Sequence, residues 1–227
     1  ETERGFGWCV TADNCWRHTG ILSLCDIGCM NLRDRALELM HEWTASESLR
    51  NHMLAVESAV VAYAREYGAD EDLWAATALL HDFDYERHPQ VGEDGHPAVG
   101  VAYLRQNGWP EELCLAILGH AGDELGVSRD SDLARVLYAC DEITGLITAA
   151  VLVRPGRDIA GLTLKSLKKK FKDKAFARGV DREDVKRGAE ELGVEVLPMD
   201  AWDFANGEIY VRFAESVRGA DAFVLQS

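Results

Sequence analysis

Residues 71–82 read EDLWAATALLHD, a mostly apolar run that ends on the adjacent pair His81 and Asp82. Apolar residues recur in it at three- and four-residue spacings, beginning with Leu73 and Ala76, and this periodicity predicts a buried helix. An imidazole and a carboxylate at the end of such a helix cost free energy to bury unless another group pairs with them. A divalent metal ion supplies that pairing, because imidazole nitrogen and carboxylate oxygen are common metal ligands. The stretch therefore predicts a core helix with a metal site at its end.

The composition is that of a globular protein with one sizeable core. The chain has 227 residues, of which 47% are hydrophobic and 28% are charged, an ordinary balance for a folded domain of this length. A net charge of −15 argues against a stable nucleic-acid partner, which normally meets a basic surface. The apolar stretch 136–153 contains Asp141 and Glu142, so it predicts a buried helix rather than a membrane span. We expect a cytoplasmic protein, and the oligomeric state is left open.

The first 29 residues differ from the rest in cysteine content and in pattern. They contain four of the six cysteines but no apolar periodicity, whereas MNLRDRALELM, which begins at Met30, reads as a convincing start. Their cysteine spacings fit no common zinc-binding pattern, and a disulfide is disfavoured in a cytosolic chain. We expect residues 1–29 to be a read-through leader outside the folded core. The alternative interpretation of this segment is a zinc knuckle formed by Cys9, Cys15, Cys25 and Cys29, with His18 as a spare ligand.

From Asn31 onward the apolar pattern is helical almost without interruption, which predicts an all-α fold. We divide it into a core at 30–155 and a small helical C-terminal extension at 156–227 that packs on the same domain. Thr44 and Glu47 form a capping-box pattern at the start of the second helix, and residues 83–95 read as a loop. The expected helices are 31–43, 47–67, 70–82, 99–106, 110–120, 131–153, 163–172, a short one opened by Asp181 and a terminal one after Pro198.

Three further residues occupy apolar helical positions where a polar side chain needs a reason. His52 shares a helix face with apolar residues, and His120 ends the apolar helix ELCLAILGH. Asp141 lies in the middle of an apolar helix, where an unpaired carboxylate costs several kcal/mol. Each alone reads as a hydrogen-bonded core residue, and Asp141 has Arg135 as an alternative partner. Taken together, they favour one shared metal centre.

The order H…HD…D resembles the HD-domain metal-dependent phosphohydrolase superfamily. It is carried by His52, by LLHDFDY with His81 and Asp82, and by ACDEITG with Asp141. The stretch 95–120, GHPAVGVAYLRQNGWPEELCLAILGH, resembles the part of the two-metal branch that contributes two more histidines. The resemblance extends over roughly 32–155 and implies an HD-type helical bundle.

The resemblance also implies a ligand set for two metal ions. It assigns His52, His81, Asp82 and Asp141 to the first ion. It makes Asp82 the bridge to a second ion held by His96 and His120. The chain departs from many members of the superfamily, because Phe83 and Asp84 replace an Ile-Gly pair and no GYP-type signature follows. The departures argue against the branch specific for cyclic-di-GMP.

Such a centre predicts phosphate-ester hydrolysis by a metal-bridging hydroxide. Four imidazoles and two carboxylates suit two divalent ions of Mn, Fe, Co, Ni or Zn and not Ca. We expect a phosphodiesterase acting on small, nucleotide-like phosphate esters. The candidate catalytic residues are Asp82 together with Asp84, His88 and Lys174.

Asp84, His88 and Lys174 are candidates because of the segments in which they lie. Asp84 and His88, like Glu86, lie in the loop after the HD pair, where they are candidates to protonate a leaving group or orient a metal-bound water. The run 163–178 contains seven Lys or Arg and one Asp, a net charge of +6. Its lysines either form a solvated helix face or, at Lys169, Lys170 and Lys174, guide an anionic ester.

Two other functions are compatible with the pattern. Mixed-valent di-iron oxygenases of the HD type resemble this chain in the same six ligands. A catalytically silent nucleotide-binding module is the second alternative, and retention of all six ligands argues against it.

Overall fold

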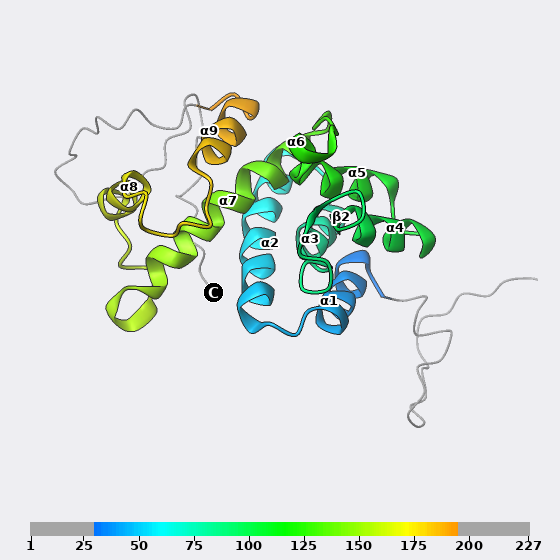
Figure 1. Cartoon of the computed structure of the whole chain (residues 1–227), viewed down its shortest axis with the longest axis horizontal. Helices are drawn as coiled ribbons and strands as arrows, with labels where there is room; N and C mark the ends of the chain where they lie inside the picture. Colours follow the sequence, from blue (N-terminus) through cyan, green and yellow to red (C-terminus); the bar gives the residue numbers. More distant parts are fainter. Residues whose placement is uncertain (1–29, 195–227) are drawn as a thin grey trace, which may run out of the picture. The chain divides into compact units, whose positions relative to one another are not determined.

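The protein is described by a computed structural model that places residues 30–194. Apart from one two-residue ladder, the regular secondary structure of this part of the chain is helical, which confirms the predicted all-α fold (Figure 1). The predicted leader at 1–29, with its cysteines, and the helix predicted after Pro198 lie outside the described residues. The elements are α1 (Leu32–Trp43), α2 (Glu47–Tyr67), α3 (Glu71–Leu80), β1 (Val91–Gly92), β2 (His96–Pro97), α4 (Ala98–Gln106), α5 (Glu111–His120), α6 (Gly122–Leu125), α7 (Asp132–Leu152), the 3-10 turn η1 (Pro155–Arg157), α8 (Leu164–Lys172) and α9 (Arg182–Glu191).

Side-chain caps set the starts of the helices that carry the site. Asp70 accepts the backbone N–H groups of Asp72 and Leu73 and so begins α3. The capping-box prediction at Thr44 was wrong, because Ser46 caps α2. Thr44 is instead fully buried. Its hydroxyl donates to the carbonyl of Phe83, so it ties the end of α1 to the turn after α3.

Helix α3 is the centre of the core. Every residue from Trp74 to Leu80 is buried, and the helix packs against both α1 and α2 (Figure 1). Leu79 and Leu80 lie in one apolar cluster with Phe83 and with residues of α1 and α2. The burial of α3 on all sides places the pair that follows it, His81 and Asp82, in the interior.

The predicted loop at 83–95 contains order that its composition does not reveal. Val91 pairs with His96 and Gly92 with Pro97 in a two-residue parallel ladder between β1 and β2. The N–H of His96 also lies 2.9 Å from the carbonyl oxygen of Gln90. These contacts hold the backbone of His96 just before α4 begins.

The C-terminal helices pack on the long helix α7 (Figure 1). Gly188 of α9 lies so close to α7 that a Cβ there would be 2.7 Å from the Cα of Ala139. The hydroxyl of Tyr138 donates to Asp184 at 2.9 Å. Helix α9 is therefore a packed part of the helical domain.

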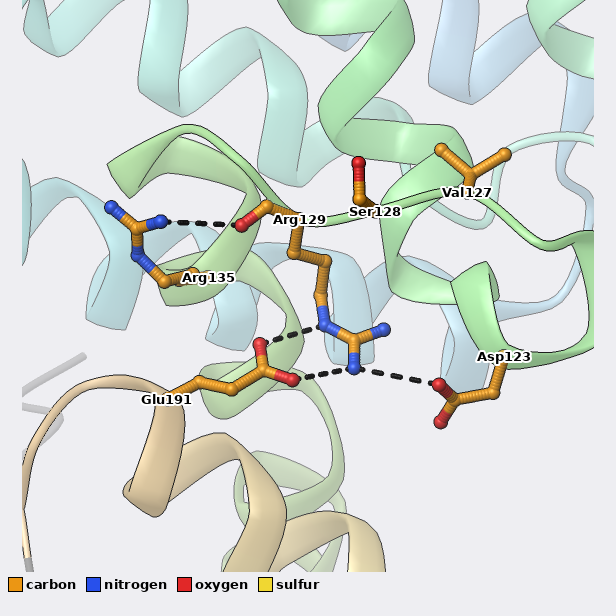
Figure 2. A pocket seen from close by; sticks show the side chains of 6 residues that line it. All are labelled: Asp123, Val127, Ser128, Arg129, Arg135 and Glu191. Atoms are coloured by element: carbon orange, nitrogen blue, oxygen red, sulfur yellow. Dashed lines mark hydrogen bonds and ion pairs between the residues drawn. The ribbon is translucent and has the colours of Figure 1, made fainter.

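A hollow of about 290 Å³ lies beside the contact between α9 and the preceding helices (Figure 2). Arg129 fills one side of it and binds both carboxylate oxygens of Glu191, at 2.7 and 2.6 Å. Its guanidinium also lies 3.6 Å from Asp123 and donates to the carbonyl of Gly119. Because Arg129 is paired on several sides, the residues around the hollow serve to join helices.

None of the helices between residues 30 and 194 is long and apolar enough to cross a membrane.

Candidate metal centre

Two of the histidines are oriented by the ends of their own helices. His81 is the C-cap of α3 and is fully buried, and its Nδ1 donates to the carbonyl of Ala78 at 2.7 Å. His120 ends α5 and donates Nδ1 to the carbonyl of Ile117 at 2.5 Å. In both cases the carbonyl is three residues earlier, where the last turn of a helix leaves it free. Each ring is thereby left with Nε2 as its acceptor nitrogen.

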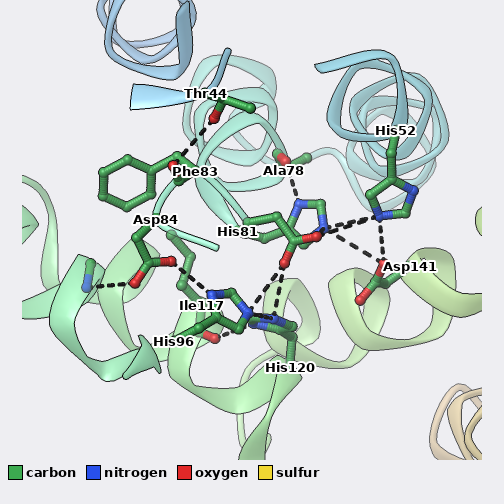
Figure 3. A network of polar contacts seen from close by, with 12 residues as sticks. Thr44, His52, Ala78, His81, Phe83, Asp84, His96, Ile117, His120 and Asp141 are labelled. Atoms are coloured by element: carbon green, nitrogen blue, oxygen red, sulfur yellow. Dashed lines mark hydrogen bonds and ion pairs between the residues drawn. The ribbon is translucent and has the colours of Figure 1, made fainter. Parts of the chain in front are cut away.

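A first ligand group joins α2, α3 and α7. His52, His81 and Asp141 each offer one ligand atom, and these atoms lie within 4.8 Å of one another. The Nε2 atom of His52 is 2.9 Å from Oδ1 of Asp141 and 3.3 Å from Nε2 of His81 (Figure 3). The distance from Nε2 of His81 to Oδ1 of Asp141 is 3.6 Å.

A second ligand group joins the HD pair to β2 and α5. Asp82, His96 and His120 also bring their ligand atoms within 4.8 Å of one another. The Nε2 atoms of His96 and His120 are 3.1 Å apart (Figure 3). Oδ1 of Asp82 is 3.2 Å from Nε2 of His96 and 3.7 Å from Nε2 of His120.

Asp82 lies between the two groups and directs one oxygen toward each. Oδ1 faces His96 and His120, whereas Oδ2 is 3.5 Å from Nε2 of His81 and 3.9 Å from Nε2 of His52. A carboxylate in this position is suited to bridge two ions. The six residues that the sequence singles out are thus brought together as two triads, and Asp82 of the second triad also faces the first.

The close imidazole pairs fit a metal ion. In each pair, His52 with His81 and His96 with His120, two Nε2 atoms face each other at 3.3 and 3.1 Å. Two neutral rings with acceptor nitrogens at this distance repel each other unless a cation lies between them or one is protonated. Nitrogen and oxygen donors that converge in this way are the ligand types of divalent transition metals.

The electrostatics of the metal-free centre favour protonation of its histidines. Burial alone would lower the pKa of His81, but Asp82 and Asp141 outweigh it and raise that pKa to about 9. Burial also opposes protonation of His96, yet its hydrogen bonds to Asp82 and Asp84 raise its pKa to about 9. Burial would raise the pKa of Asp82, but the surrounding imidazoles hold it well below its usual value. Protons therefore occupy the centre near neutral pH when metal is absent.

The other three sequence candidates lie in different surroundings. Asp84 is buried behind His96 and accepts from its Nδ1 at 2.7 Å. His88 is half-buried, and within the described chain its side chain makes no hydrogen bond, while its carbonyl accepts the N–H of His96. Lys174 is exposed between α8 and α9, and among residues 30–194 no contact joins it to the ligand groups. Glu86, considered with them, accepts the backbone N–H groups of Ala45 and Ser46, just before α2 begins.

Sequence reasoning missed two neighbours of the centre. Tyr85 places its ring edge-on to His96, with centroids 5.3 Å apart, and is 43% exposed. Glu142 accepts the N–H of Asp181 at 3.0 Å. Burial, followed by the charge of Asp141, raises the pKa of Glu142 to about 7. The sequence signal that could have singled out Glu142 is the acidic pair at 141–142 within an apolar helix. No pattern in the sequence singles out Tyr85.

Comparison with known families finds a match within the helical core. Residues 49–146 match the HD domain family, and the matched range contains all six ligand residues. The match is consistent with the HD-domain phosphohydrolase superfamily. Divalent metal binding is a property of HD domains, and the two triads are the candidate ligand groups for it.

A second match covers the C-terminal end. Residues 176–227 match the N-terminal domain of ribose phosphate pyrophosphokinase. The ribose-phosphate pyrophosphokinases of Bifidobacterium longum and Corynebacterium glutamicum are 72% and 77% identical over 39 residues, 17% of this chain and 12% of each enzyme. That of Mycobacterium tuberculosis H37Rv is 60% identical over 52 residues, 23% of this chain and 16% of the enzyme. The chain thus spans about an eighth to a sixth of these relatives. No solved structure matches the chain.

We predict that metal-free protein loses thermal stability as the pH rises from about 6.5 to about 9. His81 and His96 have pKa values raised from 6.5 to about 9 in the folded state. Their stabilising contribution is therefore complete below pH 6.5 and is lost as the pH passes 9. Each kcal/mol lost lowers the unfolding midpoint by about 2–4 °C in a domain of this size.

Thermal unfolding of EDTA-treated and Mn²⁺-loaded protein between pH 6 and 9.5 tests this. The metal-loaded protein is the control, because bound metal replaces the protons and should remove the decline. A metal-free midpoint that does not change between pH 6.5 and 9 would contradict the prediction.

Proposed function

We propose that this HD domain is a metal-dependent phosphodiesterase that hydrolyses small, nucleotide-like phosphate esters at a centre for two divalent ions. The observation that carries the proposal is Asp82, which directs one carboxylate oxygen toward each of two nitrogen-rich ligand groups. Two ions held about one carboxylate are the arrangement that serves phosphate-ester hydrolysis in many enzymes.

The ions, when bound, supply an activated water near neutral pH and positive charge for the phosphate oxygens. The protein's own contribution is to hold the ligand atoms in place and to exclude water from behind them. His81, His96 and His120 have side chains that are at most 7% exposed, and they form the closed side of the centre. Ligand positions set by helix ends in this way need little rearrangement during reaction.

The open side of the centre is the edge formed by the remaining ligands. The side chains of His52, Asp82 and Asp141 are 21%, 17% and 20% exposed. An ester that reaches the centre therefore approaches along this edge, between α2 and α7. The donor set of four imidazoles and two carboxylates favours Mn, Fe, Co, Ni or Zn.

A basic segment leads toward the same edge. The backbone N–H of Asp181 binds Glu142, the neighbour of Asp141. Val180 lies 3.4 Å from the position that a Cβ of Gly145 would occupy. Gly145 is one helical turn after Asp141 and so lies on the same face of α7.

The turn before Val180 is organised by one side chain. Arg182 donates to the carbonyls of Ala177 and Val180, each at 2.6 Å, and also to those of Phe176 and Asp173. Within the described residues, none of the lysines from α8 to this turn forms an ion pair. These lysines precede a turn that packs on α7 near Asp141, and their positive charge in an otherwise acidic protein suits a role in attracting an anionic ester.

We predict that the full chain, loaded with Mn²⁺ or Ni²⁺, hydrolyses bis-p-nitrophenyl phosphate and members of a panel of nucleotide esters. Asp82→Ala removes the carboxylate that faces both groups, so metal loading and turnover should fall to background. Asp94→Ala changes an exposed carboxylate in the loop before His96 and should keep wild-type activity. Metal analysis and initial rates are the measurements.

Two outcomes would overturn the proposal. Iron-containing protein that hydrolyses no ester in the panel would favour the di-iron oxygenase. An inactive protein that binds a nucleotide with both metal sites filled would favour the silent binding module.

We predict that Lys169→Ala/Lys174→Ala raises the KM for an anionic ester about tenfold at low salt with little change in kcat. The two lysines are exposed, so roughly 0.5 M salt should screen their attraction and bring the KM values together. Lys186→Ala, which removes a lysine paired with Glu183 on α9, is the control. An unchanged KM in the double variant would show that the lysines form only a solvated face.

A further inference from the structure

We propose that Asp84 is a positioning residue that sets the affinity for the second metal ion by holding His96. The inference rests on the proposed two-ion centre and assigns this carboxylate a role away from the substrate. Asp84 follows the HD pair by two residues, and its side chain is only 1% exposed.

Both oxygens of Asp84 are occupied. Oδ1 accepts from Nδ1 of His96 at 2.7 Å, and Oδ2 accepts the backbone N–H of Gly100 at 2.8 Å (Figure 3). The first contact makes Nδ1 the protonated nitrogen of the ring. The Nε2 atom is then the one that faces Asp82 and His120 as a ligand. A carboxylate partner of this kind fixes the ring and increases its basicity toward metal.

The approach of Asp84 to α4 depends on a glycine. A Cβ at Gly100 would lie 2.6 Å from Cγ of Asp84 and 2.8 Å from the ring of Phe83. Gly100 lies in the first turn of α4, where backbone N–H groups lack helical partners. Pro97, the N-cap of α4, has no side-chain group that accepts a hydrogen bond. Asp84, which is distant in sequence from α4, therefore accepts an N–H group of its first turn as a capping side chain would. At the same time it holds the ring of His96.

His96 is distinguished from the other three histidine ligands by this partner. His81 and His120 are held by carbonyls of their own helices, so their orientation follows from helix geometry alone. For His52, no partner of Nδ1 is found within residues 30–194. Among the contacts of residues 30–194, His96 is the one histidine of the four that is held by a carboxylate outside the two ligand groups, and it belongs to the second group.

Asp84→Asn tests the inference because it changes the hydrogen-bonding capacity with little change in shape. His96 and Gly100 both donate, and the asparagine amide can accept with one oxygen only, so its NH₂ must face one of the two donors. We expect the affinity for the second Mn²⁺ ion to fall about 10–100-fold, with the first ion still bound. Mn²⁺ titration of the full chain, followed by metal analysis and electron paramagnetic resonance, measures this. Wild type should show a spin-coupled pair of ions where the variant shows a single ion.

Two further variants separate positioning from general loosening. Thr44→Val removes the hydrogen bond to the carbonyl of Phe83, in the same buried turn, without touching a ligand, and should bind both ions as wild type does. Gly100→Ala keeps the carboxylate but displaces it, and should weaken the second ion as Asp84→Asn does. Retention of the first ion shows that each variant is folded.

The inference is overturned if Asp84→Asn binds both ions with wild-type affinity. It is also overturned if Thr44→Val weakens the second ion as much, or if Asp84→Asn weakens both ions equally. Ester hydrolysis is not a readout here. A wild-type protein that binds two ions and hydrolyses nothing would therefore remove the proposed function and leave this inference standing.

Discussion

The structure depends on the burial of one carboxylate, that of Asp82, between two pairs of imidazoles. A buried carboxylate is costly unless positive charge meets it, and here its two oxygens face separate pairs of histidines. The ligands come from α2, α3, α5 and α7 and from β2, so the charge at the centre binds these elements together. Helix α3 makes this possible, because its burial carries the HD pair that follows it into the interior of the domain.

Much of this arrangement could be predicted from the sequence, because helical periodicity and ligand type are local properties. The all-α fold follows from apolar spacing, and five of the six candidate ligands lie within or at the end of apolar helices. The sixth, His96, was assigned through the family resemblance. His81 and His120 are cases in point, since each ends an apolar run and each is oriented by a carbonyl three residues earlier. The mutual placement of the two ligand groups is the part that needed the structure.

The features that could not be predicted are contacts between residues distant in sequence. Thr44 fits a capping-box pattern, but its hydroxyl binds the carbonyl of Phe83, and Ser46 caps the helix. Asp84 looks like a loop charge, yet it is buried by its contacts with His96 and Gly100. In each case a tertiary partner offers a better hydrogen bond than the local pattern does.

In the C-terminal part, too, the sequence match does not reveal which tertiary contacts the segment makes. The match to pyrophosphokinases begins at residue 176 and so includes α9. In the structure this helix packs on α7, through Gly188 against Ala139 and through the pair formed by Asp184 and Tyr138. Helix α9 is therefore packed against the helix that carries Asp141, although its sequence matches the pyrophosphokinases.

The central claim is that Asp82 joins two metal sites. Anomalous X-ray diffraction from crystals of the Mn²⁺-loaded protein tests it most directly. The account predicts two peaks about 3.5–4 Å apart, one among His52, His81 and Asp141 and one between His96 and His120, with Asp82 contacting both. A single peak, or two peaks that do not share Asp82, would contradict it.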